Sequence, residues 1–156
     1  MFRRTDAQRE WFKRIDEKYP LNTAFDSWYL CCLIGLVTGK KNPDGAAGKE
    51  ITATFVSEYK KVQHLIIAML IKAEIAKFGT DTSNKEEMRI LMERLLDPKM
   101  DLSKDGFKAA NSYAEGGFEF LRMKFAERGQ PDRAGDFLIK YGMVLSDAIE
   151  SSDIYQ

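Results

Sequence analysis

The single histidine is the first residue to test for catalytic chemistry, because imidazole is the side chain whose ordinary pKa lies nearest to neutral pH. His64 stands near Lys60, Lys61 and Ile67 at helical spacing, and no nucleophile motif with a serine or cysteine lies beside it in the sequence. A structural or partly exposed histidine accounts for this setting, so we assign no catalytic residue and predict a protein that is not an enzyme. A small enzyme with a site assembled from dispersed residues, and His64 as its general base, stays open as an alternative.

Two cysteines, Cys31 and Cys32, are adjacent in the chain. Consecutive residues of a helix point about 100° apart, so the two thiols cannot share one helix face. A zinc site would need further cysteine or histidine ligands, and one histidine leaves almost none. We therefore predict no metal site, no redox centre and no cofactor. The absence of a disulfide framework favours a reducing, cytoplasmic location.

Two loops approach ligand-binding motifs without completing them. Residues 45–49, Gly-Ala-Ala-Gly-Lys, have two residues rather than four between the glycines of a phosphate-binding loop, and Glu50 follows the lysine. Residues 101–106 match the start of an EF-hand loop, with oxygen-bearing side chains at its first, third and fifth positions and glycine at its sixth. Ser112 stands where the bidentate glutamate belongs. The expected roles are therefore a flexible connection and a turn with a helix N-cap, without calcium binding.

Charge is balanced over the chain but divided between its halves. The 24 basic and 24 acidic side chains cancel, which argues against binding nucleic acid by bulk charge alone. Residues 1–78 carry 13 Lys or Arg and 9 Asp or Glu, a net +4, whereas residues 79–156 carry 11 and 15, a net −4. A solvated face would explain these charges, but clustered in space they could contact phosphates or an acidic partner. The candidate contact residues are Arg3, Arg4, Arg9, Lys13, Arg14, Lys40, Lys41, Lys49, Lys60 and Lys61.

The elements that must position these residues are predicted to be helices. Residues 5–8 have the form of a capping box, which opens a helix that stops before Pro20. A second helix, from residue 22 or 23 to about Gly39, has too few polar positions to be exposed and should be buried on most sides. Residues 39–50 form the clearest loop. A long third helix over residues 52–78 is apolar over more than half its circumference and is the expected central helix, ended by Gly79.

Three further helices complete the prediction. Residues 83–86 form another capping box, whose helix should end at Asp97, before a proline. A fifth helix spans residues 103–127 and must either break or pack tightly at Gly116 and Gly117; the last begins near Pro131. No sustained period-two strand pattern occurs, and the longest apolar runs are far below the roughly 18 residues of a membrane-spanning helix. We predict one all-α domain over residues 1–156, a bundle of five to seven helices outside the membrane.

One stretch has a recognisable layout. Residues 25–36, Phe-Asp-Ser-Trp-Tyr-Leu-Cys-Cys-Leu-Ile-Gly-Leu, lead to the basic loop Gly-Lys-Lys-Asn-Pro at residues 39–43, and a long apolar segment follows. Over residues 22–78 this layout resembles small accessory proteins of prokaryotic DNA-phosphorothioation (dnd-associated) and related phage-defence systems. The resemblance implies a non-enzymatic subunit that works with larger nucleases or ATPases on DNA.

These observations lead to a first hypothesis and its alternatives. The first is a non-catalytic helical interaction subunit of a bacterial multiprotein assembly, such as an antiviral defence system, which binds a larger protein through apolar helix faces. In that assembly it could contact nucleic acid as part of the complex, and self-association stays open. The alternatives are direct nucleic-acid binding by the basic N-terminal half and the small enzyme with His64 described above.

Overall fold

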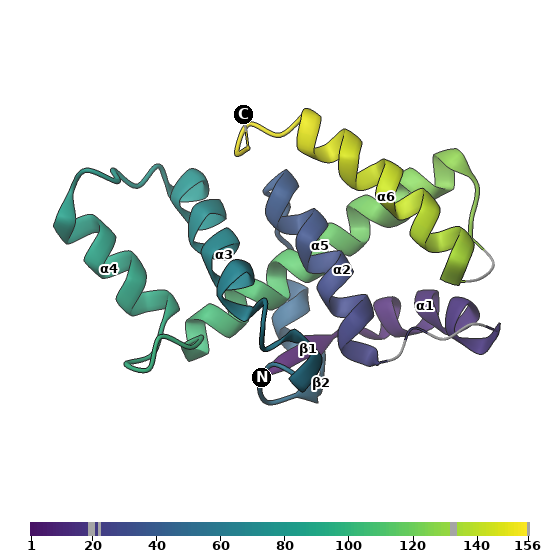
Figure 1. Cartoon of the computed structure of the whole chain (residues 1–156), viewed down its shortest axis with the longest axis horizontal. Helices are drawn as coiled ribbons and strands as arrows, with labels where there is room; N and C mark the ends of the chain where they lie inside the picture. The colour runs from purple at the N-terminus through teal and green to yellow at the C-terminus, as the bar shows by residue number, and fades with distance from the viewer. Residues whose placement is uncertain (19–20, 22, 132–133, 156) are drawn as a thin grey trace.

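The computed structural model describes residues 1–18, 21, 23–131 and 134–155, and the part of the chain that it describes is predominantly helical. The predicted all-α class is confirmed. Figure 1 shows the arrangement of the helices. In chain order the elements are β1 (Phe2–Arg4), α1 (Asp6–Lys18), α2 (Ala24–Thr38), the 3₁₀ helix η1 (Pro43–Ala47), β2 (Lys49–Thr52), the 3₁₀ helix η2 (Ser57–Tyr59), α3 (Gln63–Phe78), α4 (Lys85–Leu95), α5 (Lys104–Arg128) and α6 (Ala134–Glu150).

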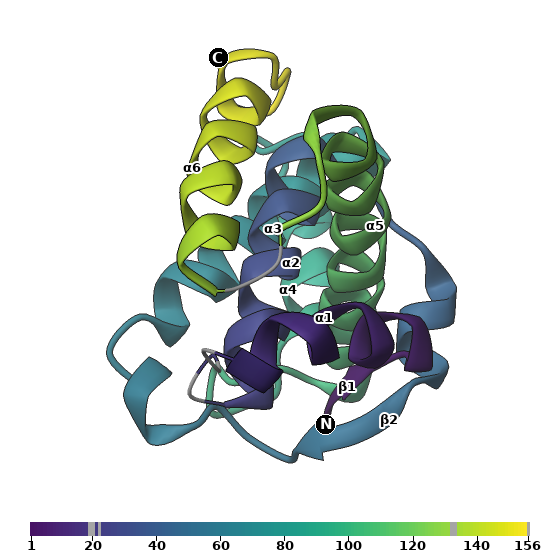
Figure 2. The same cartoon turned by 90° about the vertical axis from the view of Figure 1, so that its right-hand side faces the viewer.

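A small sheet corrects the expectation of a chain without strands. β1 and β2 pair antiparallel, with Phe2 opposite Thr52 and an irregular register between Phe2 and Arg3 (Figure 2). Strands of three and four residues are too short to show a period-two pattern in the sequence. The pairing fixes the N-terminus, because it brings the Phe2 ring among Phe25, Trp28 and Phe55.

The central helix is α5, so the prediction of a long central helix over residues 52–78 is wrong. Residues 49–52 are a strand and 57–59 a 3₁₀ turn, and only residues 63–78 form α3. In α5, the stretch from Ala109 to Phe118 is buried at every position. Most of this stretch is glycine, alanine and serine, and their low hydropathy gave no sign in the sequence that the stretch is buried. Small side chains are what allow neighbouring backbones to enclose a helix.

Glycines set the crossing of α2 and α5. A Cβ atom added to Gly117 would overlap the Cys31 carbonyl oxygen and lie 2.5 Å from the Gly35 nitrogen. One added to Gly35 would overlap the Tyr113 carbonyl oxygen. Of the two predicted outcomes at Gly116 and Gly117, tight packing is therefore the one observed, and α5 runs through them without a break.

Several predicted helix ends are confirmed. Thr23 caps α2 in a full capping box with Asp26, and Gly79 ends α3 with a left-handed φ of 62°. Ser103 caps α5, its hydroxyl accepting a hydrogen bond from the Gly106 amide at 3.0 Å. This cap is the role predicted for the loop at residues 101–106.

Other helix ends differ from the prediction. The Thr5 hydroxyl accepts from the Gln8 amide, but the Gln8 side chain donates to Glu115 instead of completing a capping box. Asn84, not Ser83, caps α4, because the side-chain oxygen of Asn84 accepts hydrogen bonds from the backbone amides of Glu86 and Glu87. That helix ends at Leu95 rather than Asp97. The last helix is described from Ala134, and residues 132–133, between it and Pro131, lie outside the described residues.

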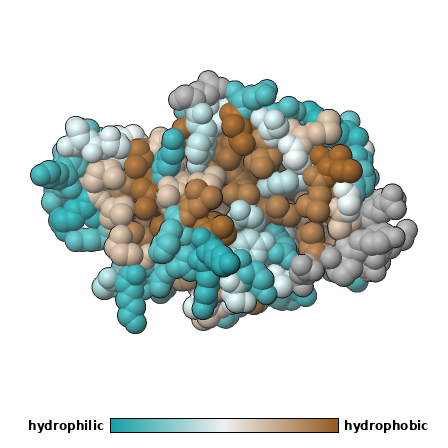
Figure 3. Space-filling view, in the orientation of Figure 1, coloured by the Kyte–Doolittle hydropathy of each residue, from teal (hydrophilic) through white to brown (hydrophobic). Residues whose placement is uncertain are grey.

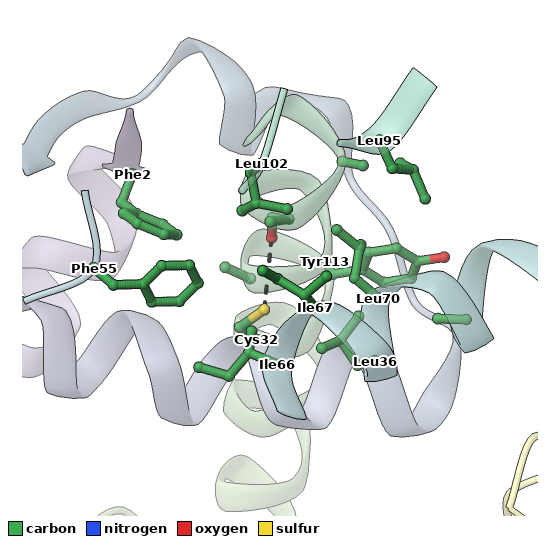
Figure 4. Close-up of a cluster of buried hydrophobic side chains, with 14 of the residues drawn as sticks. Phe2, Cys32, Leu36, Phe55, Ile66, Ile67, Leu70, Leu95, Leu102 and Tyr113 are labelled. Atoms are coloured by element: carbon green, nitrogen blue, oxygen red, sulfur yellow. Dashed lines mark hydrogen bonds between the residues drawn. The ribbon is translucent and has the colours of Figure 1, made fainter. Parts of the chain in front are cut away.

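The core consists of two apolar clusters, one on each side of the α2–α5 crossing. One joins α2 and α5 to α1 and α6 through Phe12, Phe118 and Phe137. The other joins them to α3, α4 and the sheet (Figure 4). Within it the Cys32 thiol donates to the Ala110 carbonyl, the interaction drawn as a dashed line in Figure 4. Among the described residues, no helix is at once long and apolar enough to cross a membrane.

Candidate functional site: an open groove on α2

One face of α2 is left partly uncovered between α3 and α6. α5 covers the opposite face, and Figure 2 shows α2 between α5 and α6. The uncovered stripe has the one-turn spacing of a helix face and carries Tyr29, Leu30 and Leu33, all half-buried. Tyr29 lies towards the segment before α3, where its ring contacts Tyr59 of η2. Leu30 lies on the α6 side, where its backbone carbonyl accepts a hydrogen bond from the Tyr141 hydroxyl at 2.6 Å. We call this region the α2 groove.

α6 forms one wall of the α2 groove and carries more apolar surface than the core uses. Its inward stripe, which includes Phe137, Tyr141 and Val144, is buried. Four further apolar side chains stay exposed on two other faces of the helix: Leu138 (48%) and Ile149 (43%) share one, and Ile139 (71%) and Met143 (54%) share another. Figure 3 shows hydrophobic surface gathered over α6 and between α6 and α3. An exposed apolar surface of this kind marks an interaction site on a soluble protein.

α3 forms the other wall, and its exposed side is apolar and positively charged. Leu65 is 57% exposed, and Lys72 and Lys77 follow it along the helix. The ammonium of Lys72 lies 4.7 Å from the centre of the Tyr155 ring. Glu74, the acid of this helix, is fully buried, so α3 presents no carboxylate to solvent.

Glu74 is neutralised inside the protein by two cations. Lys41 donates to its Oε1 at 2.8 Å, and Arg94 donates to its Oε2 at 2.7 Å. Burial acts to raise the pKa of Glu74, but the hydrogen bonds from the two cations outweigh it, so the pKa lies below its ordinary value. Both cations also lie over the Phe78 ring, at 5.7 Å and 5.2 Å from its centre. The cluster connects the end of α2, α3 and α4.

A cavity of about 530 Å³ lies beyond the C-terminal end of α2, between α3 and α6. Its walls come from α3, α5, α6 and the segment that follows α6. Phe120, Val144 and Ile154 supply apolar surface, and Lys77 and Lys124 reach its edge. The segment is held in place because the Ser152 hydroxyl donates to the Val37 carbonyl at 2.6 Å. The volume falls within the range of pockets that enclose small ligands or anchoring side chains.

Six of the basic residues predicted as contacts have partners within the protein, and three of the six are half-buried. Arg3 donates to the Gly48 carbonyl at 2.8 Å, and Arg4 donates to the Ser27 hydroxyl at 2.6 Å. Lys41 binds the buried Glu74. These charges help to hold the N-terminus and the loop after α2 against the core, so they do not form an accessible basic surface.

The remaining predicted contacts are distributed over separate parts of the surface. Arg9 and Lys49 pair with Asp6 at 3.0 Å and 3.4 Å, and Arg14 reaches the Pro131 carbonyl at 3.4 Å. The other four are Lys13, Lys40, Lys60 and Lys61. Figure 1 shows that α1, the end of α2 and the segment before α3, which hold these four, lie apart.

The other side chains that could take part in catalysis or metal binding have ordinary surroundings. His64 is exposed in the first turn of α3. Cys31 and Cys32 are fully buried, and burial raises the pKa of both thiols. Among the described residues, no group of three or more potential metal ligands occurs. Asp101, in the EF-hand-like loop, is contacted by the Gln63 amide at 3.4 Å.

Sequence reasoning missed the α2 groove. A signal was present in the sequence, because Leu138, Ile139 and Met143 widen the apolar arc of the last helix beyond Phe137, Tyr141 and Val144. Comparison of the chain with known protein families, with curated proteins and with solved structures found no match. Function is therefore argued from the geometry of the α2 groove.

Proposed function

We propose that the protein is a non-catalytic interaction subunit that binds a partner protein through the α2 groove. The observation that supports this is the exposed pair Leu138 and Ile149 on one face of α6, beside the half-buried stripe of α2. Burying the exposed halves of these two large apolar side chains contributes about 1 kcal/mol each, before the entropy cost of association. That is a useful share of a binding free energy, and it is concentrated in one place.

The alternatives have less support. Direct nucleic-acid binding needs basic residues gathered on one surface, whereas the predicted set is divided between internal partners and separate regions. Catalysis by His64 needs an orienting partner and a nucleophile, and the described residues place neither in hydrogen-bond contact with it. The resemblance to accessory proteins of DNA-phosphorothioation systems names the first assembly in which to look for the larger partner.

The test compares two variants matched in exposed area. Leu138→Ser with Ile149→Ser removes apolar surface from the α2 groove, and Ile90→Ser with Met100→Ser removes a similar amount elsewhere, because those side chains are 55% and 53% exposed. Tagged wild-type protein and both variants are purified from the native host, with and without nuclease. We expect a co-purifying protein that survives nuclease, is lost from the groove variant and is retained by the control.

Equal recovery of that protein with all three chains would overturn the proposed function. Recovery that nuclease abolishes would do the same, because it would show that nucleic acid, not apolar contact, links the two proteins.

A further inference from the structure

We propose that the occupant of the α2 groove is one amphipathic helix of the partner, with an apolar stripe on α2 and an acidic flank facing α3. This assignment rests on the proposed function and names the shape and charge of the ligand.

The shape follows from the packing of the helices. α3 and α6 each pack on α2, and the uncovered stripe of Tyr29, Leu30 and Leu33 runs between them. Helices in a bundle pack with their axes 8–10 Å apart, and side chains at one-turn spacing fit the stripe of another helix. A helix laid on α2 between α3 and α6 would therefore occupy the position of a missing bundle helix.

The charge follows from the asymmetry of the two walls. Lys72 and Lys77 are the lysines of α3, and within the described part of the chain neither has a carboxylate partner. The α6 side is apolar at Leu138 and Ile149. Of the acids that line the cavity, Asp147 already binds Arg128 at 2.6 Å, and Asp153 belongs to the segment that follows α6. Carboxylates on the partner would be favoured on the α3 side, and lysines there would be repelled.

The cavity at the end of the groove adds a position for a large side chain. Its walls of Phe120, Val144 and Ile154 are apolar, and its volume of about 530 Å³ accommodates an aromatic ring. Anchors of this kind carry much of the affinity when a helix binds in a groove. The partner helix would therefore place an aromatic residue towards one end of its apolar stripe.

The test uses synthetic helical peptides of about five turns, read by fluorescence anisotropy with the full chain. One has a leucine stripe with a terminal tryptophan and a glutamate flank; a second has lysines in place of the glutamates; a third has serines in place of the stripe. We expect the acidic peptide to bind about tenfold more tightly than the basic one, with a difference that narrows at high salt, and the serine peptide not to bind.

Charge reversal on the protein distinguishes binding to the lysines of α3 from attraction to the net charge of the whole protein. Lys72→Glu with Lys77→Glu should reverse the preference between acidic and basic peptides, whereas Lys99→Glu with Lys104→Glu, which makes the same change of net charge elsewhere, should preserve it. Circular dichroism of each variant checks that the helices are intact.

Equal binding of the acidic and basic peptides, or no binding of either, would overturn the helix assignment. Sedimentation that shows a dimer which Leu138→Ser with Ile149→Ser dissociates would also overturn it, because a second copy would then fill the groove. The proposed function is judged separately: loss of a partner in the affinity purification without any peptide preference would refute only the helix with its acidic flank.

Discussion

Replacement of Gly117 by alanine should strongly destabilise the protein, although alanine is the better helix former. The new Cβ would overlap the Cys31 carbonyl oxygen and lie 2.5 Å from the Gly35 nitrogen, inside the 3.0 Å below which Cβ contacts essentially do not occur. Both neighbours are backbone atoms, so no side chain can rotate away and α2 must move off α5. Overpacking of a core costs about 1–3 kcal/mol and occasionally more, and the rigid neighbours place this site at the upper end. The helix-propensity gain of about 1 kcal/mol offsets only part of that cost.

The matched control is Gly142→Ala in α6, where an added Cβ has no atom within 4 Å. There the propensity gain stands alone, and the free energy of unfolding should rise by about 0.5–1 kcal/mol. Urea unfolding followed by circular dichroism measures both variants, and we expect Gly117→Ala to lose at least about 2 kcal/mol. If the two variants are equally stable, the close backbone contact between α2 and α5 does not determine how these helices pack.

Three further predictions concern the buried groups. Lys41→Glu should lower the free energy of unfolding by at least about 2 kcal/mol in a urea titration, because it places a second carboxylate beside Glu74. The same change at the exposed neighbouring residue, Lys40→Glu, should change the free energy of unfolding little. Similar effects of the two substitutions would refute the internal role of Lys41. The pKa of Glu74 is lower in the folded protein, so the ionised carboxylate contributes fully to stability above its ordinary pKa near 4.3, and this contribution is lost as the pH falls through the folded pKa. Glu74→Gln should therefore reduce the fall in melting temperature at acid pH, and an unchanged fall would contradict this role. Cys31 and Cys32 should resist a thiol reagent in the native protein and react rapidly in denaturant, since burial raises the pKa of both; rapid native labelling would show that they are accessible.

The sequence determined those features that depend on local chemistry. Helical periodicity predicted the all-α class, and the boundaries of α2 and α5 came out within one or two residues, because Thr23 and Ser103 are caps whose hydrogen bonds reach only their own helix. Gly79 ended α3 as expected, since its left-handed φ is needed whatever the rest of the fold does. These signals act over one helical turn, so a single sequence is enough to detect them.

Tertiary structure decided which helix became the centre and where a surface stayed open. Average hydropathy favoured residues 52–78, but the Gly35–Gly117 crossing lets α2 and α5 approach more closely than large side chains would allow, and this contact placed α5 inside. The sheet pairs Phe2 with Thr52, 50 positions along the chain, and the hydrogen bond of Lys41 to Glu74 spans 33 positions. No local pattern encodes either contact. The α2 groove is of the same kind, because it exists only where α3 and α6 both reach α2 and leave a stripe between them. A sequence shows that a helix has an apolar face, but only the assembled helices determine whether that face is covered.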